Sequence, residues 1–266
     1  MKLGKIMACL DLLFSTYEDR IYDLISTLPK YKEGQKIIIV HQTMRSEGFD
    51  RVNKFFQQRS DVTYVKQFSY GVTKSRNLAI TLATSDYILF CDDDVVYTDN
   101  LYDIVVGALQ NSVACTFRVA STEGGFTKEF SEFSKRHTRL SILSVGTIEI
   151  ACQREFLIEH SIKFPEDLGA GARYPCCDEP VFLSRIIDKG ASVTYVPITI
   201  CAHPAISSGM SLNSGVGIMS RLIAFKYIFG RFFYIPLFIL FCLKNINKIG
   251  FKALLSLIKI LIERRL

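Results

Sequence analysis

The sequence lacks the marks of several protein classes. It has no Trp, only four His and seven Pro in 266 residues, and no internal repeat or low-complexity tract. Its eight Cys form no C-x-x-C pair and show no regular spacing, which disfavours a zinc site or a disulfide framework and favours thiols in a reducing compartment. Walker-type loops, G-x-S-x-G and H-E-x-x-H are also missing, which weakens ATPase, hydrolase and zinc-enzyme interpretations.

Acidic residues are scarce in the C-terminal part of the chain. The net charge is +6, but residues 218–266 hold nine basic residues and one acidic residue, so residues 1–217 have a net charge of −2. This division predicts a near-neutral body with a basic appendage, and it disfavours a nucleic-acid-binding domain. With 49% apolar and 22% charged residues, the chain is not disordered as a whole.

The N-terminus does not have the pattern of a signal peptide. The basic start of the chain leads into an apolar run that is broken by Asp11, and no small-residue cleavage site follows. The body is therefore expected in the cytoplasm.

The first 120 residues alternate strand-like and helix-like patterns. Apolar runs of strand length alternate with segments of helical periodicity, which predicts an α/β fold: a mostly parallel sheet flanked by helices. The strands are expected at 5–14, 36–41, 62–66, 87–91 and from 113, and the helices near 21–28, 52–56, 73–82 and 101–108. Ligands of such sheets bind beyond the carboxyl ends of the strands, where Ser15, Thr16 and Gln42 lie. Residues 121–217, with a helix at 179–189 and strands at 193–202, are expected to complete the sheet and bind a second substrate.

Three consecutive carboxylates follow the apolar run 87–91. Asp92, Asp93 and Asp94 repel one another, and a divalent cation would compensate this repulsion. Asp92 and Asp94 point to the same side of an extended chain, so both can reach one ion. The alternative is a solvated acidic turn before the next helix.

A basic helix start lies upstream of these carboxylates. Lys74, Arg76 and Asn77 stand near the beginning of the helix expected at 73–82, where free backbone amides favour anions. Alone, such residues are usually solvated. Together with a metal-type acidic cluster they predict a phosphate or nucleotide site.

The segment GVTKSRNLAITLATSDYILFCDDDV resembles the central block of family 2 glycosyltransferases. The resemblance implies a GT-A-type, Rossmann-like nucleotide-sugar-binding fold with an Asp-x-Asp motif. It places Arg76 and Asn77 at the nucleotide and Asp93 near the donor sugar or ribose. It also implies that Asp92 and Asp94 bind Mn²⁺ or Mg²⁺ on the donor diphosphate.

The segment 166–185 is similar to the part of the family that carries the catalytic carboxylate. The family pattern is Glu-Asp followed by an aromatic residue, whereas this chain has Asp178-Glu179 with Phe182 three residues after Glu179. Glu179 therefore takes the place of the catalytic base and Asp178 that of its support. A carboxylate base opposite a departing diphosphate implies transfer with inversion.

Two further positions concern the donor. Similar enzymes often place a His near the metal and diphosphate, and His203 stands there in this chain; a structural His is the alternative. Where family members commonly have Asp after the second strand, this chain has His41-Gln42, so Gln42 is the candidate for the base. UDP, dTDP and GDP remain open.

The C-terminal part predicts membrane contact. Residues 232–243 are 12 apolar residues with Pro236 inside, too few for a spanning helix, which needs about 20. From 252 onward the pattern is that of an amphipathic helix with a basic polar face, typical of a segment that lies on an anionic membrane surface. Packing on the body is the alternative.

These patterns predict a glycosyltransferase domain at 1–217, with a nucleotide-sugar-binding half at 1–120 and an acceptor or catalytic half at 121–217, and a membrane-associating helical tail at 218–266. The function expected is metal-dependent inverting transfer from a nucleotide-diphosphate sugar to a lipid-linked saccharide. The enzyme would act in cell-surface polysaccharide synthesis, peripherally on the inner membrane face. The rival hypotheses are a catalytically silent sugar-nucleotide-binding partner of an assembly complex, and a basic membrane-surface or nucleic-acid adaptor.

Overall fold

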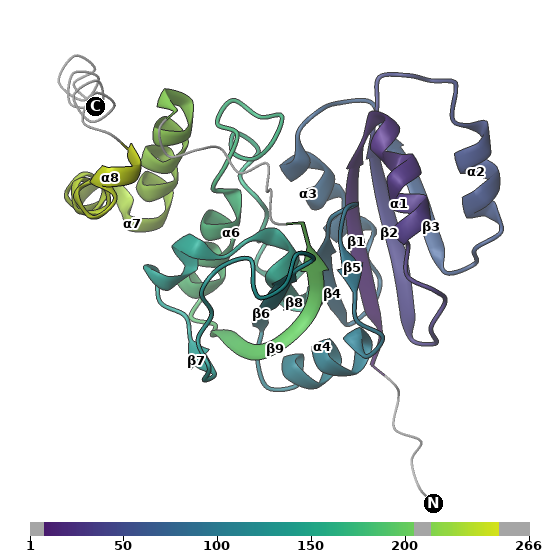
Figure 1. Cartoon of the computed structure of the whole chain (residues 1–266), viewed down its shortest axis with the longest axis horizontal. Helices are drawn as coiled ribbons and strands as arrows, with labels where there is room; N and C mark the ends of the chain where they lie inside the picture. The colour runs from purple at the N-terminus through teal and green to yellow at the C-terminus, as the bar shows by residue number, and fades with distance from the viewer. Residues whose placement is uncertain (1–7, 205–213, 250–266) are drawn as a thin grey trace, which may run out of the picture.

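A curved, mixed sheet with helices on both faces forms the body of the protein (Figure 1). The computed structural model describes residues 8–204 and 214–249. The strands expected from the sequence are present, and shorter ones complete the sheet. They are β1 Leu10–Tyr17, β2 Gln35–Gln42, β3 Val62–Gln67, β4 Tyr87–Cys91, β5 Val96–Tyr97, β6 Ala114–Ser121, β7 Lys135–Arg136, β8 Ile150–Gln153 and β9 Val193–His203.

The expected helices also form, within a few residues of their predicted ends. The α-helices are α1 Ile21–Thr27, α2 Asp50–Gln57, α3 Val72–Leu82, α4 Leu101–Leu109, α5 Arg154–Glu159, α6 Asp178–Asp188, α7 Gly215–Lys244 and α8 Ile246–Ile249. The 3-10 helices are η1 Glu18–Arg20, η2 Ser141–Ser144 and η3 Thr147–Glu149.

The sheet is mixed, although most of its long strands are parallel. Its order is β3-β2-β1-β4-β8-β6-β9-β5, with β7 paired to β9. β3, β2, β1 and β4 are parallel neighbours, and β6 is parallel to β9. β8 is inserted antiparallel between β4 and β6, so residues that follow the nucleotide-binding half join the two parts of the sheet.

Two hydrophobic cores cover the two faces of the sheet. Side chains alternate along β1, so that Leu12 and Phe14 pack on the face covered by α1, α2 and α4, while Leu13 packs on the face of α3 and α6. This burial on both sides explains why the strands are apolar throughout. The carboxyl ends of β1, β2 and β4 meet at one edge, where the predicted site residues lie.

The helix α7 is broken within its length. Gly230 has φ 70° and ψ 176°, and the segments before and after it pack on each other through Phe225, Phe238 and Phe241. By its length and apolar composition, α7 could cross a membrane. The break at Gly230, however, divides it into two segments that are each shorter than a membrane-spanning helix. The first segment also packs on the body, through Ala224 and Ile228. The amphipathic helix predicted from 252 lies outside the described residues.

Candidate active site

Asp93 anchors the acidic triplet to the end of β1. Its side chain is buried and accepts a hydrogen bond of 2.7 Å from Thr16 Oγ1, and it forms an ion pair with Arg20 of η1. Burial raises the pKa of Asp93 to about 6, against the opposing effects of Thr16 and Arg20. Asp93 thus holds the triplet in place, while its two neighbours are more accessible.

Asp94 and His203 face each other across the sheet edge. His203 Nε2 lies 3.3 Å from Asp94 Oδ1, and its Nδ1 lies 2.6 Å from the Pro204 carbonyl oxygen. A carbonyl only accepts, so Nδ1 carries the proton in that bond. In a neutral ring Nε2 then presents a lone pair to a carboxylate, and two acceptors so close need a proton or a cation between them.

Asp94 and His203 could supply part of the ligands of a metal ion whose other ligands come from the substrate. Within 8–204 and 214–249 no three His, Cys, Asp or Glu side chains converge as a metal-binding group. Mg²⁺ is commonly held by one or two carboxylates plus substrate phosphates, and Mn²⁺ accepts similar oxygen ligands and imidazole. Asp92 lies close by, and burial, with the charges of Asp94 and Glu179, raises its pKa against the influence of Arg76. The donor set thus suits Mn²⁺ or Mg²⁺ completed by a diphosphate.

Arg76 joins three segments that are distant in the sequence. Its Nη1 lies 2.6 Å from Asp178 Oδ2 and 3.9 Å from Glu179 Oε1, and its Nη2 lies 3.7 Å from Asp92 Oδ1. The guanidinium is 8% exposed and Asp178 4% exposed, so this ion pair is shielded from water. Arg76 therefore holds the acidic end of β4 beside the start of α6.

Asp178 and Glu179 have different surroundings. Burial and the neighbouring Glu179 raise the pKa of Asp178, although Arg76 opposes them. Glu179 accepts a 2.5 Å hydrogen bond from Thr147 Oγ1 of η3, and its side chain remains 20% exposed. Only Glu179 of the two can meet a substrate while keeping its protein partner.

Some of the residues predicted to bind the nucleotide form hydrogen bonds with the protein backbone. Asn77 donates to the Phe164 carbonyl at 3.1 Å and accepts from the Phe164 N–H at 2.7 Å. Gln42 Oε1 accepts from the Gly71 N–H at 2.8 Å and fixes the turn before α3. Lys74 is exposed in the first turn of α3. Ser15 Oγ is buried with no hydrogen-bond partner among the described residues.

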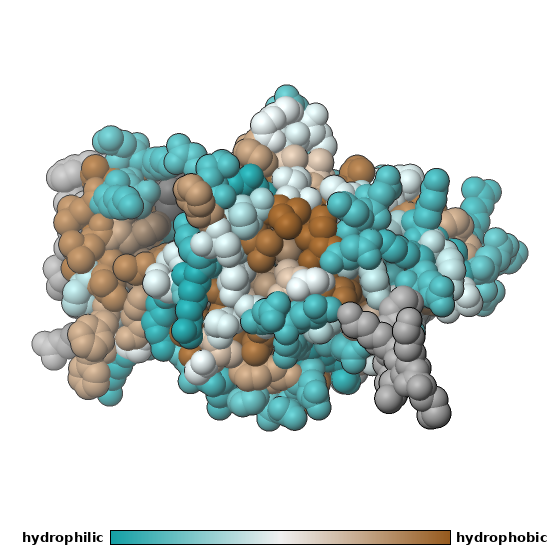
Figure 2. All heavy atoms as spheres, turned by 90° about the horizontal axis from the view of Figure 1, so that it is seen from below, coloured by the Kyte–Doolittle hydropathy of each residue, from teal (hydrophilic) through white to brown (hydrophobic). Residues whose placement is uncertain are grey.

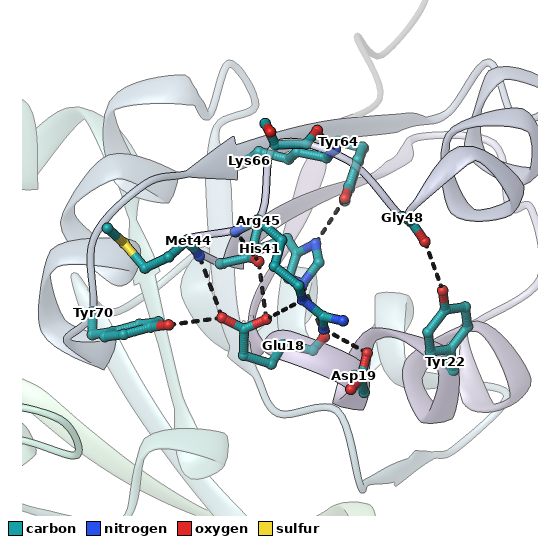
Figure 3. Close-up of polar contacts among 12 residues, drawn as sticks. Glu18, Asp19, Tyr22, His41, Met44, Arg45, Gly48, Tyr64, Lys66 and Tyr70 are labelled. Atoms are coloured by element: carbon teal, nitrogen blue, oxygen red, sulfur yellow. Dashed lines mark hydrogen bonds and ion pairs between the residues drawn. The ribbon is translucent and has the colours of Figure 1, made fainter.

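Sequence reasoning missed Glu18, which ties the ends of β1 and β2 together (Figure 3). Its carboxylate points between Tyr70 and Arg45 and accepts hydrogen bonds from Tyr70 Oη, Thr43 Oγ1, the Met44 N–H and Arg45 Nε. Burial raises the pKa of Glu18, but these bonds outweigh it and lower the pKa to about 2. Next to it, His41 is buried between Tyr64 Oη and the Glu18 carbonyl, and burial lowers its pKa.

Arg20 and Thr147 were also missed. Arg20 follows β1 directly, so its position at a strand end is a signal that could have identified it. Thr147 stands in the short 3-10 helix η3, 32 residues before Glu179, and no local pattern indicates that contact.

A family model confirms the resemblance. The model for glycosyl transferase family 2 matches residues 16–162, which is more than half of the chain, so the protein belongs to this family. Its fold is of the GT-A type. A search of curated proteins gave no match.

Several solved structures share the fold at low sequence identity. A crystal structure of S. aureus TarS 1-349 has TM-score 0.63 and 14% identity, over 82% of this chain and 65% of that one. The same fragment in complex with UDP-GlcNAc has TM-score 0.63 and 15% identity, over 82% of this chain and 66% of that one. A mannosyltransferase from Pyrobaculum calidifontis, in complex with GDP-Man and Mn²⁺, has TM-score 0.57 and 16% identity, over 85% of this chain and 64% of that one. This chain therefore spans slightly less than two thirds of these chains.

Proposed function

We propose that the protein is a metal-dependent, inverting glycosyltransferase that moves a sugar from a nucleotide-diphosphate donor to a lipid-linked saccharide in cell-surface polysaccharide synthesis. The observation that carries this proposal is the convergence on Arg76. One guanidinium brings together the acidic end of β4 and the Asp178-Glu179 pair at the start of α6. The carboxylates proposed to bind the metal and the carboxylate proposed as the base thus lie in one site. Displacement of the nucleoside diphosphate at the anomeric carbon requires both groups close to the reacting sugar.

Each residue of the site has a separate role in this mechanism. Glu179, oriented by Thr147, accepts the proton of the attacking sugar hydroxyl. Asp178 and Arg76 keep Glu179 in position. Asp94 and His203, with Asp92 beside them, would hold Mn²⁺ or Mg²⁺ against the donor diphosphate. The metal, when bound, stabilises negative charge on the departing nucleoside diphosphate.

The donor occupies the edge formed by β1, β2 and the start of α3. Ser15 Oγ is the one predicted donor contact that is buried without a hydrogen-bond partner among the described residues, and a bound donor would supply that partner. Lys74 is exposed in the first turn of α3, and in this proposal it contacts a phosphate of the donor. UDP-GlcNAc and GDP-Man are the first donors to test, because the solved structures of TarS 1-349 and of the mannosyltransferase include complexes with them.

The lipid-linked acceptor is supported by the position of α7. This helix starts beside the site, where Arg221 lies 3.7 Å from Cys176, and ends in a segment with exposed apolar side chains. In Figure 2 apolar surface gathers at the end of the molecule where α7 lies. A site next to a membrane-contacting helix pair suits an acceptor whose lipid stays in the bilayer.

Variants of the carboxylates test the mechanism. With UDP-GlcNAc or GDP-Man and Mn²⁺, Glu179→Gln is expected to lower the rate of donor turnover by about 10²- to 10⁴-fold, the usual contribution of a general base. Asp94→Asn is expected to weaken Mn²⁺ binding in the presence of nucleoside diphosphate, measured by calorimetry. Asp103→Asn is the matched control, because Asp103 is 72% exposed on α4 and forms an ion pair with Lys32 at the surface. Unchanged turnover in Glu179→Gln would remove the proposed base, and donor binding without turnover on any acceptor would favour the silent partner.

A further inference from the structure

Two consecutive cysteines stand directly before the catalytic carboxylates, and the mechanism does not use them. Cys176 and Cys177 are partly exposed, and their sulfur atoms are 3.5 Å apart. Cys177 is the N-cap of α6 and has φ 73°, a left-handed conformation that is uncommon outside glycine. By contrast, most of the other thiols are buried in the cores, and burial raises the pKa of Cys91 and Cys152.

Arg221 of α7 makes this pair electrostatically distinct. Its Nη1 lies 3.7 Å from Cys176 Sγ and is held there by a 2.9 Å hydrogen bond to the Gly217 carbonyl oxygen. Cys177 S–H donates to Cys176 Sγ. This bond, together with Arg221 and Ser220, lowers the pKa of Cys176 against the effects of burial and of Glu179. Cys176 is thus the nucleophile of the pair, and Cys177 is the neighbouring thiol.

We propose that Cys176 and Cys177 form an oxidative modification site, at which a hydroperoxide converts the dithiol to a disulfide between the two neighbours. The Cys176 thiolate attacks the peroxide, which forms an S–O bond and releases water or an alcohol after protonation, and Cys176 becomes a sulfenic acid. The Cys177 sulfur then displaces the hydroxyl group as water and forms the S–S bond. The peroxide gains the two electrons that the two thiols lose.

The disulfide would disturb the start of α6. Neighbouring Cα atoms are about 3.8 Å apart across a trans peptide, whereas disulfides usually join Cα atoms roughly 4.4 to 6.8 Å apart. The peptide between the two cysteines must therefore distort, and Asp178 is the next residue. A displacement of the catalytic group by about 1 Å can lower the rate by about 100-fold. The same strain makes the disulfide easy for a thiol to reduce, so the inhibition is reversible.

Peptide mapping tests the chemistry independently of the enzyme's activity. Trypsin cleavage after Arg173 and Arg185 places both cysteines in one peptide, 174–185. After treatment of the full chain with stoichiometric hydrogen peroxide and then iodoacetamide, this peptide is expected to lose two hydrogen atoms and to resist alkylation until dithiothreitol is added. Cys9, which is also partly exposed, is the internal control and should remain alkylatable. A peptide 174–185 that is still alkylated at both cysteines would overturn the proposal.

The effect on catalysis rests on the proposed function and is measured separately. Donor turnover should fall by about 100-fold in the oxidised wild type and return with dithiothreitol. Cys176→Ser should retain the basal rate and be resistant to peroxide, while Cys9→Ser should remain as sensitive as the wild type. Full oxidation of the peptide without a change in turnover would overturn the inhibitory role. Absence of turnover before oxidation would instead count against the proposed function, and the peptide map would still decide the thiol chemistry.

Discussion

At the scale of single residues, the environment of Glu179 separates it from Asp178. Thr147 Oγ1 gives Glu179 a short hydrogen bond, whereas Asp178 is fully engaged with Arg76 inside the protein. A carboxylate that is oriented by one hydroxyl and still partly exposed can take a proton from a substrate. We expect the Thr147 hydroxyl to position Glu179 for this step.

Removal of that hydroxyl should slow catalysis. Thr147→Val keeps the shape of the side chain but loses a hydrogen bond to a charged group, which contributes about 1.5 to 3 kcal/mol. We expect kcat to fall by roughly tenfold or more, with little change in the KM for the donor, in steady-state assays. Thr147→Ser keeps the hydroxyl and should recover most of the rate. Equal losses in both variants would assign Thr147 a purely packing role.

His137 should make the protein sensitive to acid. It is buried between Thr116 Oγ1 and Ser141 Oγ, and burial, followed by Lys135 and Lys128, lowers its pKa from 6.5 to about 4. The folded state therefore binds fewer protons than the unfolded state between these values. The stability that the neutral ring contributes is present above pH 6.5 and is lost as the pH falls toward 4.

The expected loss is about 3 kcal/mol in the free energy of unfolding between roughly pH 7 and pH 4, from 1.36 kcal/mol per pKa unit. Urea unfolding at these two pH values measures it. His137→Gln should be less stable at neutral pH but lose less on acidification. If the free energy of unfolding fell as much on acidification in His137→Gln as in the wild type, groups other than His137 would cause the acid sensitivity.

The motif residues of the site could be predicted from the sequence, but their partners could not. The end of an apolar strand and the run of carboxylates identify Asp92 and Asp94 as candidates, because these features are local, whereas Glu179 is a candidate through the family resemblance. Asn77 and Gln42 are predicted at the nucleotide, and in the structure their amide groups also hydrogen-bond to the Phe164 and Gly71 backbones. Such contacts depend on the tertiary fold: Asn77 and Phe164 are 87 residues apart in the chain.

At the scale of elements, a close approach between a loop and a helix shapes the site. Gly169 has φ 97°, and a Cβ there would lie 2.9 Å from Thr73 Cγ2 and 3.0 Å from Asp178 Oδ1. Thr73 Oγ1 also donates to the Leu168 carbonyl at 3.0 Å. The loop can pass between α3 and the start of α6 only because residue 169 has no side chain.

Gly169→Ala should therefore destabilise the protein more than a glycine substitution in open space. Gly190 is the control, because it has φ 80° and a Cβ at this position would meet no atom of the described residues within 4 Å. Both variants should lose about 1 kcal/mol or more in the free energy of unfolding, because alanine is strained in a left-handed backbone conformation. At Gly169 the close contacts of the new methyl group should cost about 1 to 3 kcal/mol more. Thermal unfolding of the two variants measures the difference. Equal melting temperatures would mean that the neighbours of Gly169 move aside freely.

Helices and strands with a strong hydrophobic periodicity were predicted well. Elements that form only because of their neighbours in the tertiary structure were not. The long parallel strands and the helices α3, α4 and α6 followed from apolar runs and helical spacing. β8 has four residues and exists because β4 and β6 flank it, so no local signal indicated it. The start of α7 at Gly215 and its break at Gly230 also went unpredicted, because the apolar residues there were interpreted as one tail.

At the scale of the whole molecule, α7 gives the protein one apolar and basic end. Phe232, Phe233 and Leu240 are 83%, 68% and 61% exposed, and Arg231 and Lys244 flank this segment. No Asp or Glu occurs at 189–262 in the sequence. Apolar side chains beside uncompensated basic charge favour an anionic bilayer surface over water.

Substitution of both aromatic residues should weaken membrane binding. Removal of a Phe side chain from an apolar phase costs about 1.5 to 3 kcal/mol, so Phe232→Ser with Phe233→Ser should lower binding to phosphatidylserine-containing vesicles by more than about tenfold in co-sedimentation. Phe133→Ser is the matched control, since Phe133 is 80% exposed and is not part of α7. An equal effect of the control, or none from the pair, would contradict the membrane role of this segment.

The antiparallel strand β8 has a consequence for synthesis on the ribosome. β4 lacks its neighbour on one side until residues 150–153 have left the exit tunnel, and β6 lacks β9 until 193–203 have followed. At about 5 to 20 residues per second, the first four parallel strands wait several seconds with an open apolar edge. Such an edge can pair with other chains, so this interval, more than the stability of the finished protein, should set the yield of folded enzyme in a cell that makes it rapidly.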